Sequence, residues 1–162
     1  NYFLGIIMFS ENDYVIYYRD ICFIKKIEDN YYCLSPILDS SLIIKIPINK
    51  NNVLKKILSK KEALSLIEKI PSINIISDTK NMELSYKMLL KTENREDLIR
   101  IIKTTYLRNE KRVNTHKKTS DRDLEYFYLA EKYLYSELSI VLGLSYDDTK
   151  KFVIDEVSKL LK

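Results

Sequence analysis

The chain has 162 residues, of which 46% are hydrophobic and 31% charged, and its formal net charge is +4. This length accommodates one domain or two small ones, and the composition is that of a folded globular protein rather than a disordered one. No apolar run reaches the roughly 18 to 20 residues that a membrane-spanning helix needs, so we expect a cytoplasmic protein with no membrane partner. The first residue is Asn and a Met stands at position 8. Residues 1–7 are therefore as compatible with an added segment ahead of the natural start as with a part of the natural chain.

Residues 13–57 consist of short apolar runs, rich in Ile, Val, Tyr and Phe, that are separated by turn-forming residues. The runs are YVIYY, ICFIKKIE, YYCLSPIL, LIIKIPI and VLKKI. Strands without a helix between them must pair antiparallel, and so few strands bury a core best as a small barrel. Pro36 and Pro47 fall inside two of the runs, which predicts sheet edges or bulges there. Residues 1–58 are therefore expected to form a small antiparallel β-barrel.

From Ser59 onward the apolar residues recur with the period of a helix. Ser59 and Glu62 have the spacing of a capping box, which predicts a first helix that ends at Pro71. Cap and breaker residues predict further helices at about 78–91, after Asn94, from Ser120 to Gly143 and from Ser145 to the C-terminus. The expected fold class is α+β, with residues 59–162 forming a five-helix all-α domain.

The sequence offers few residues for catalysis. Neither glycine, Gly5 or Gly143, lies in a strand-to-helix turn, which excludes phosphate-binding loops of the Walker and dinucleotide types. His116 is the lone histidine and has no acid or nucleophile close by in the sequence, so a surface position is favoured over a general base. Cys22 and Cys33 lack metal-ligand spacing and are expected to be buried thiols. We therefore expect no enzyme, no cofactor and no metal site.

Positive charge is concentrated in residues 98–122, which hold eight Lys or Arg against two acids. A phosphate-binding face has this pattern, although a solvated helix surface has a similar one. If these side chains bind DNA phosphates, affinity should fall steeply with salt, because each neutralised phosphate releases a counterion. The strand SLIIKIPI offers a second possibility for recognition, since an exposed strand can pair with a protein partner.

The order of these motifs resembles a known family. FSENDYVIYYRDICFIKKIE followed by YYCLSPILDSSLIIKIPINK is similar to the RNA-polymerase-interacting domain shared by CarD/CdnL-type bacterial transcription regulators and the transcription-repair coupling factor. SKKEALSLIEKIP, NREDLIRIIKTTYLRNEKR and EYFYLAEKYLYSELSIVLGLS are similar to the helical domain of the CarD/CdnL type. The resemblance extends from Phe9 to about Leu161, and it departs from the family where YRDIC replaces the glycines often found after the first strand.

The resemblance implies a non-enzymatic transcription regulator whose Tudor-like N-terminal barrel binds the β subunit of RNA polymerase. In the family a basic residue precedes the Ile/Val-Pro pair of the fourth strand and helps to hold that subunit; this position is Lys45 here. A Lys on an edge strand can pair with acids of the partner once main-chain pairing has fixed the register. The other implied polymerase contacts are Ile43, Ile46, Pro47, Lys25 and Lys26.

The resemblance also implies that the helical domain contacts promoter DNA at the upstream edge of the transcription bubble and stabilises the open complex. Contacts would be mainly to the backbone and the minor groove, with little base specificity. Relatives insert a tryptophan there; this chain has none, and the position corresponds to Ile75 or Ile76 within PSINIISDTKN. Either an isoleucine opens a base step as an apolar wedge, or both pack against the first helix. The implied phosphate contacts are Lys80, Lys87, Arg108, Lys111, Arg112, Lys117 and Lys118.

Three classes of function follow from these patterns. The leading hypothesis is a nucleoid-associated regulator bound to RNA polymerase. The alternative is a stand-alone DNA-binding protein whose barrel is only structural, and an enzyme is the least supported class. The two expected domains are compatible with a monomer or with a domain-exchanged dimer.

Overall fold

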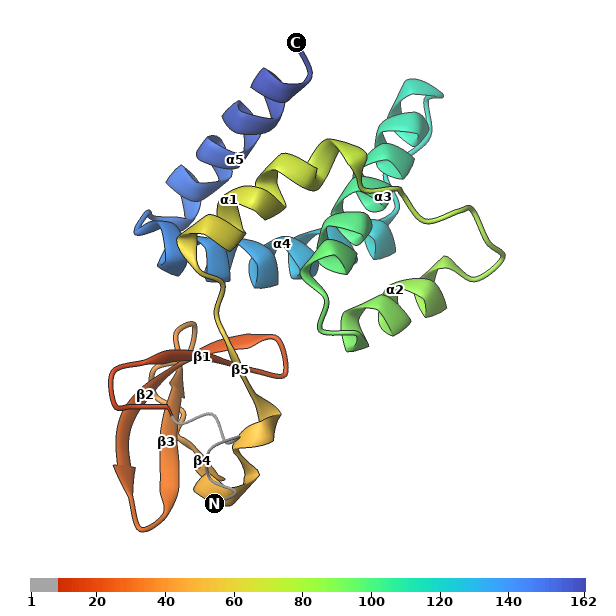
Figure 1. Cartoon of the computed structure of the whole chain (residues 1–162). Coiled ribbons are helices and arrows are strands. Elements are labelled where there is room, and N and C mark those ends of the chain that lie inside the picture. The colour runs from red at the N-terminus through yellow and green to blue at the C-terminus, as the bar shows by residue number, and fades with distance from the viewer. Residues whose placement is uncertain (1–8) are drawn as a thin grey trace. The chain divides into compact units, whose positions relative to one another are not determined.

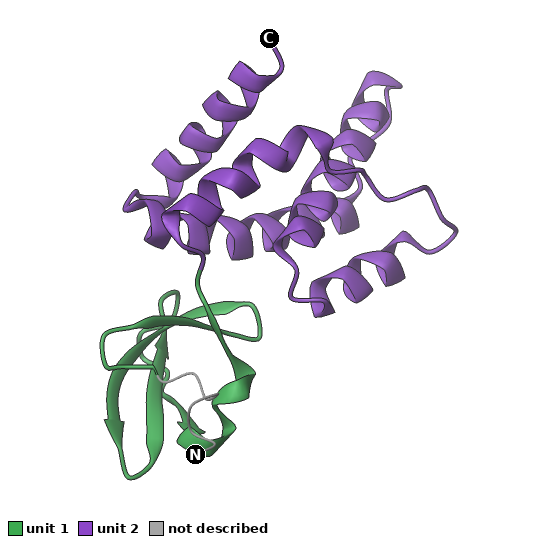
Figure 2. Ribbon diagram, viewed as in Figure 1, with its two compact units in different colours: residues 1–57 green, residues 58–162 purple. Residues whose placement is uncertain are grey.

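The computed structural model describes residues 9–162 and has an α+β architecture, with a five-stranded antiparallel sheet followed by helices (Figure 1). The chain divides into two compact units, residues 1–57 and 58–162, and each contains its own apolar core (Figure 2). None of the helices in the described part of the chain combines the length and the apolar character needed to cross a bilayer. The expected segment at residues 1–7 lies outside the described residues.

The sheet of the first unit is a curled half-barrel (Figure 1). Its spatial order is β4-β3-β2-β1-β5, and every neighbouring pair is antiparallel, as the helix-free spacing of the runs predicts. The two edge strands are therefore β4 and β5. The strands are β1 (Tyr14–Tyr17), β2 (Asp20–Glu28), β3 (Tyr31–Pro36), β4 (Ile44–Pro47) and β5 (Leu54–Lys56), with a 3-10 segment, η2 (Ile48–Val53), ahead of β5.

Two short turns set the register of β1, β2 and β3. Tyr18 and Arg19 connect the first pair of strands, Asp29 and Asn30 connect the second pair, and all four residues have positive φ. Paired positive φ values define the type I′ turn, whose twist matches that of the flanking strands. Asp and Asn tolerate this conformation, whereas Tyr and Arg are strained in it because Cβ crowds the following carbonyl. The first turn therefore keeps its geometry at a cost in stability.

The prolines of the strands occupy different places in the sheet. Pro47 ends the edge strand β4, which is a position where a missing N–H is tolerated. Pro36 ends β3 opposite Cys22 of β2 and lies beyond Leu34, the last residue of β3 that pairs with β4, so β3 has a neighbouring strand on one side only at Pro36, as the predicted edge requires, and has no bulge there. A strand end tolerates proline because the ladder stops there. The break in register lies in β2 instead, between Ile24 and Lys26.

The helices of the second unit each begin behind a capping Ser or Asn. Ser59 and Glu62 form the predicted capping box: the Glu62 N–H donates to Ser59 Oγ at 3.1 Å, and the Ser59 N–H donates to Glu62 Oε1 at 3.0 Å. Hydrogen bonding with Ser59 lowers the pKa of the Glu62 carboxyl. Gly143 ends α4 in the left-handed conformation. The helices are α1 (Lys60–Lys69), α2 (Met82–Lys91), α3 (Arg95–Asn114), α4 (Asp121–Leu142) and α5 (Tyr146–Leu160), with a 3-10 turn, η3 (Ile70–Ser72), after α1.

The predicted start of α2 near Asp78 is wrong. Asn81 is the N-cap, because its side chain accepts a hydrogen bond from the Leu84 N–H at 3.1 Å. Residues 71–81, called the connector below, therefore run from η3 to α2 without helical structure beyond Ser72, as an extended loop (Figure 1). The core of this unit lies where α3 packs along α4, and its fully buried side chains include Ala63, Tyr86, Ile101, Ala130 and Leu138.

Candidate docking edge and nucleic-acid surface

Strand β4 presents an open edge in the first unit. Within the described residues it pairs only with β3, so its other side offers main-chain donors and acceptors to a partner. Lys45 is exposed on this strand, and Ile43 immediately before it is 46% exposed. Ile46 is only 7% exposed and packs in the core. A partner strand on this edge would thus meet Lys45 and Ile43, while Ile46 holds the strand from the inside.

Lys45 belongs to a row of side chains on the face of the sheet opposite the core. Lys26 and Lys45 are both register partners of Cys33, so the three side chains share that face. Cys33 is nonetheless buried, and Lys26 forms an ion pair with Glu28 at 2.9 Å. The hydrogen bond to Lys26 lowers the pKa of the Glu28 carboxyl, and the charge of Lys45 lowers it further. Two lysines and one carboxylate therefore lie together close to the open edge.

The remaining predicted contacts of this unit are more dispersed. Lys25 is the extra residue at the register shift of β2, where its side chain is exposed. Pro47 is half-buried at the end of β4. Two exposed leucines were missed by the sequence interpretation: Leu38 and Leu42 are 61% and 47% exposed in the loop that enters β4. The sequence places both leucines inside strand-like runs, whereas β3 ends at Pro36 and β4 begins at Ile44, so both lie in the loop between the two strands.

The isoleucines of the connector in the second unit differ in their exposure to solvent. Ile73 is buried and Ile76 is half-buried against the helical core, whereas Ile75 is 47% exposed. The Ile76 N–H donates to Thr104 Oγ1 at 2.9 Å. The sequence left open whether one of Ile75 and Ile76 is available to DNA or whether both pack against the helices. In the structure Ile76 packs with the helices, and Ile75 is available at the surface.

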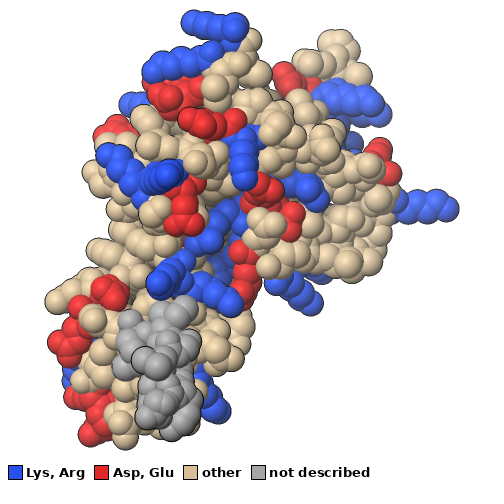
Figure 3. Space-filling model, in the orientation of Figure 1, with Lys and Arg blue, Asp and Glu red and all other residues tan. Residues whose placement is uncertain are grey.

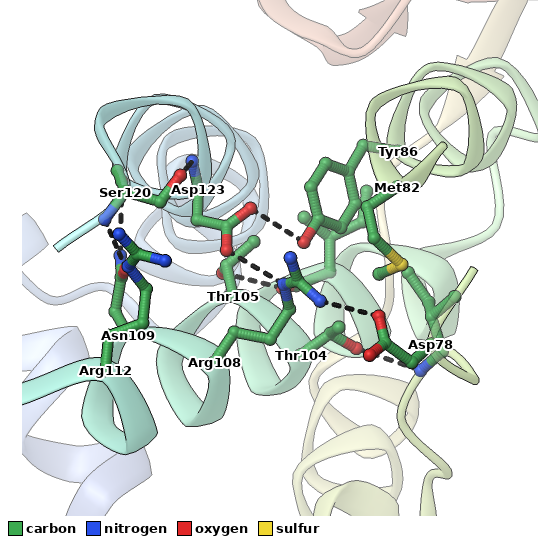
Figure 4. Close-up of polar contacts among 12 residues, drawn as sticks. Asp78, Met82, Tyr86, Thr104, Thr105, Arg108, Asn109, Arg112, Ser120 and Asp123 are labelled. Atoms are coloured by element: carbon green, nitrogen blue, oxygen red, sulfur yellow. Dashed lines mark hydrogen bonds and ion pairs between the residues drawn. The ribbon is translucent and has the colours of Figure 1, made fainter. Parts of the chain in front are cut away.

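Side chains of α3 hold the connector. Lys103 Nζ donates to the carbonyls of Ile70 and Ile73 at 2.8 and 2.6 Å, and burial lowers the pKa of this ammonium. Arg108 lies between two carboxylates, that of Asp123 on α4 and that of Asp78 in the connector (Figure 4). Lys103 was part of the basic segment noted in the sequence, but its internal role had no local signal. Its partners lie about 30 residues earlier in the chain.

The basic residues predicted to bind phosphates differ in whether an acid already pairs with them. Arg108 and Lys87 are engaged with acids: Arg108 Nη1 is 2.8 Å from Asp78, and Lys87 Nζ is 3.4 Å from Glu83. On the face drawn in Figure 3, Lys and Arg alternate with Asp and Glu over the helices. Lys80, Lys111, Lys117 and Lys118 are exposed and form no ion pair with residues 9–162.

Three of these exposed lysines, Lys111, Lys117 and Lys118, lie at the end of α3 and in the turn between α3 and α4, whereas Lys80 lies in the connector. Arg112 shapes this turn, since its Nε donates to the Lys118 carbonyl at 2.6 Å. Asn109 fixes the start of α4 by accepting the Ser120 N–H at 2.7 Å (Figure 4). His116, in the left-handed conformation, is exposed in the same turn. The arrangement presents exposed ammonium groups on an ordered turn, which suits contact with phosphates.

No protein-family model matches this chain, and no curated protein matches it at a significant level. Among residues 9–162, no group of three or more His, Cys, Asp or Glu side chains is placed to hold a metal ion. The β4 edge, the connector and the α3–α4 turn are the features from which we infer a function.

Proposed function

We propose that the protein is a transcription regulator of the CarD/CdnL type, in which the first unit is a Tudor-like domain that binds the β subunit of RNA polymerase. The second unit would contact promoter DNA at the upstream edge of the transcription bubble and stabilise the open complex. The observation that carries the proposal is the open edge of β4 with Lys45 exposed on it. No chemistry of its own is required of the protein, which acts by holding polymerase and DNA together.

The β4 edge supports the first half of the proposal. Main-chain pairing along an edge supplies affinity, and side chains beside it supply selectivity for the partner. Lys45 and Lys26 favour an acidic partner strand, while Ile43 and Leu42 add exposed apolar surface. Lysine is a point charge and lacks the bidentate geometry of arginine, so this contact should tolerate some displacement of the partner acid.

The surface of the second unit supports the other half. Lys111, Lys117 and Lys118 are free to neutralise phosphates, and their contribution should fall with rising salt. Ile75 adds an exposed apolar side chain that is suited to wedge between base pairs. An isoleucine stacks on bases less than an aromatic ring does, so the expected effect on the open complex is modest.

A pull-down of the full chain with the isolated polymerase β subunit tests the proposal. We expect binding by the wild type, at least tenfold weaker binding by Lys45→Glu because the reversed charge repels the acidic partner, and little change for Lys50→Glu. Lys50 is a matched control, since it is exposed in η2 rather than on the β4 edge. Absence of wild-type binding, or equal loss for both variants, would contradict the proposal.

The exposed lysines of the α3–α4 turn also favour a second candidate, a stand-alone DNA-binding protein. That function needs no partner for the β4 edge. Tight duplex binding that weakens steeply with salt, together with no association with polymerase, would support it over the first proposal.

A further inference from the structure

We propose that Arg108 is a positioning residue: it fastens the connector to α3 and α4, and so keeps Ile75 presented at the surface, instead of binding DNA phosphates itself. The consequence for transcription rests on the function proposed above. The fastening itself is a property of the isolated protein and is tested without polymerase or DNA.

The guanidinium of Arg108 is held on one side by a buried carboxylate. Nε donates to Asp123 Oδ2 at 2.9 Å, and the side chain of Asp123 is only 4% exposed. The other carboxylate oxygen of Asp123, Oδ1, accepts a hydrogen bond from the Tyr86 hydroxyl at 3.0 Å. Burial and this hydrogen bond raise the pKa of Tyr86, so the phenol stays a donor at neutral pH. The position of Arg108 is thus fixed by α2 and α4 before the connector is considered (Figure 4).

A second nitrogen of the Arg108 guanidinium reaches the connector. Nη1 donates to Asp78 Oδ1 at 2.8 Å, and the side chain of Asp78 is otherwise 85% exposed. A solvent-exposed carboxylate samples several rotamers unless an interaction with a fixed cation selects one of them. We infer that Arg108 orders this end of the connector, and that Asp78 serves as the ion-pair partner of Arg108 rather than as a binding group for an external ligand.

Two neighbouring side chains of α3 hold the rest of the connector. Thr104 lies one turn before Arg108 on the same helix face, and its Oγ1 accepts the Ile76 N–H while donating to the Arg100 carbonyl at 2.7 Å. That second bond fixes the orientation of the hydroxyl. Lys103 binds the carbonyl of Ile73. Ile75 therefore lies between anchored residues on both sides, and its exposed orientation is set by the protein in advance of any binding.

The charges of this cluster distinguish a positioning role of Arg108 from a purely electrostatic one. Arg108 faces two carboxylates, Asp78 and Asp123, so the three groups together carry a net negative charge. If the cluster acted on DNA only through its charge, removal of Asp78 would tighten DNA binding. If Arg108 acts by positioning, removal of Asp78 loosens the connector and weakens the effect of Ile75.

Hydrogen exchange of single amides, followed by NMR on the full chain, tests the fastening. Asp78→Asn should speed exchange of the Ile76 amide by up to about fivefold, the factor that corresponds to loss of an exposed ion pair. The amides of Leu98 and Ile101 in α3 should be unchanged, which separates a local release from global destabilisation. Glu110→Gln is the control, since it removes an exposed acid from the same basic segment without touching the connector.

Arg108→Lys completes the test. It retains the positive charge but lacks the second donor arm, so it should speed exchange at Ile76 as Asp78→Asn does. Unchanged protection of Ile76 in both variants, or the same change in Glu110→Gln, would overturn the proposal. Open-complex lifetime is read separately: if the wild type does not lengthen it, the proposed function fails, while the exchange data still decide the role of Arg108.

Discussion

The two candidate surfaces are held in place by different kinds of interaction. Strand β4 is positioned by a main-chain ladder to β3, and Ile46 anchors it in an apolar core. The connector has no ladder and is held by three side chains of α3, Lys103, Thr104 and Arg108. A surface built on a ladder depends on the local pattern of the strand, whereas one built on side chains depends on partners far away in the sequence.

The cores of the two units differ in the same way. The core of the first unit is formed by apolar and aromatic side chains such as Val15, Ile24 and Leu34. In the second unit α4 buries three carboxylates, each paired with a cation. Removing one partner of such a pair leaves a buried charge uncompensated, which is strongly destabilising. Substitutions in these pairs should therefore have the largest effects on stability. The pairs are Asp123 with Arg108, Glu131 with Lys150 and Glu137 with Arg95.

Glu137→Ala is expected to have the largest effect. Glu137 accepts two hydrogen bonds from Arg95, at 2.8 and 2.6 Å, and one from the Leu58 N–H at 2.8 Å. Its loss should lower the free energy of unfolding of the second unit by about 3–5 kcal/mol, because a buried ion pair and the hydrogen bond to the Leu58 N–H are removed together. Urea denaturation followed by the helical circular dichroism signal measures this change.

The matched control is Glu156→Ala, which removes an exposed carboxylate bound to Lys159 on α5. Exposed pairs of this kind contribute about 0.5 kcal/mol or less. Equal effects of the two substitutions would contradict the contrast between buried and exposed pairs.

The next largest difference is expected between Ile76→Trp and Ile75→Trp. Ile76 packs against the helical core, so a larger ring should cost about 1–3 kcal/mol of stability through overpacking. Ile75 is exposed, and the same change there should stay within about 0.5 kcal/mol. Thermal unfolding of both variants measures the difference. If Ile75→Trp were the more destabilising change, the assignment of the surface residue would be reversed.

The smallest effect is expected at the first turn of the sheet. Replacing Tyr18 by Asn and Arg19 by Gly should raise the stability of the first unit by about 1 kcal/mol, because these residues suit the positive φ of a type I′ turn. The stability of the isolated residues 9–57, if they fold alone, or amide exchange in β1 and β2 of the full chain, reports the gain. Asn30→Gly in the second turn should gain less, since Asn already tolerates this conformation. A loss of stability in the first pair would contradict the strain assigned to Tyr18 and Arg19.

Much of the fold follows from local signals. The capping box of Ser59 and Glu62, the caps Asn94, Ser120 and Ser145, and the antiparallel strands were all predictable because they depend on neighbours in the sequence. The start of α2 was misplaced because Asp78 and Asn81 are both good caps, and Asp78 is instead bound to Arg108. A contact between side chains 30 residues apart leaves no trace in a local pattern.

The candidate sites show the same limit. Lys45 could be placed on a strand, and Pro47 in the same run predicted a sheet edge or bulge; the sheet order confirms the edge. Ile75 and Ile76 could not be separated, because the connector has no regular period beyond its first residues. The bond from Ile76 to Thr104 decides between them. In the sequence, Arg108 could not be distinguished from the other basic residues of the segment 98–122; its two carboxylate partners are seen only in the structure.

The lifetime of open promoter complexes, measured with bacterial RNA polymerase after a competitor is added, tests the central claim most directly. With the wild-type chain present, we expect dissociation to slow severalfold, Lys45→Glu to abolish the effect and Lys50→Glu to retain it. The same lifetime with and without the wild-type chain, or full activity of Lys45→Glu, would contradict the account.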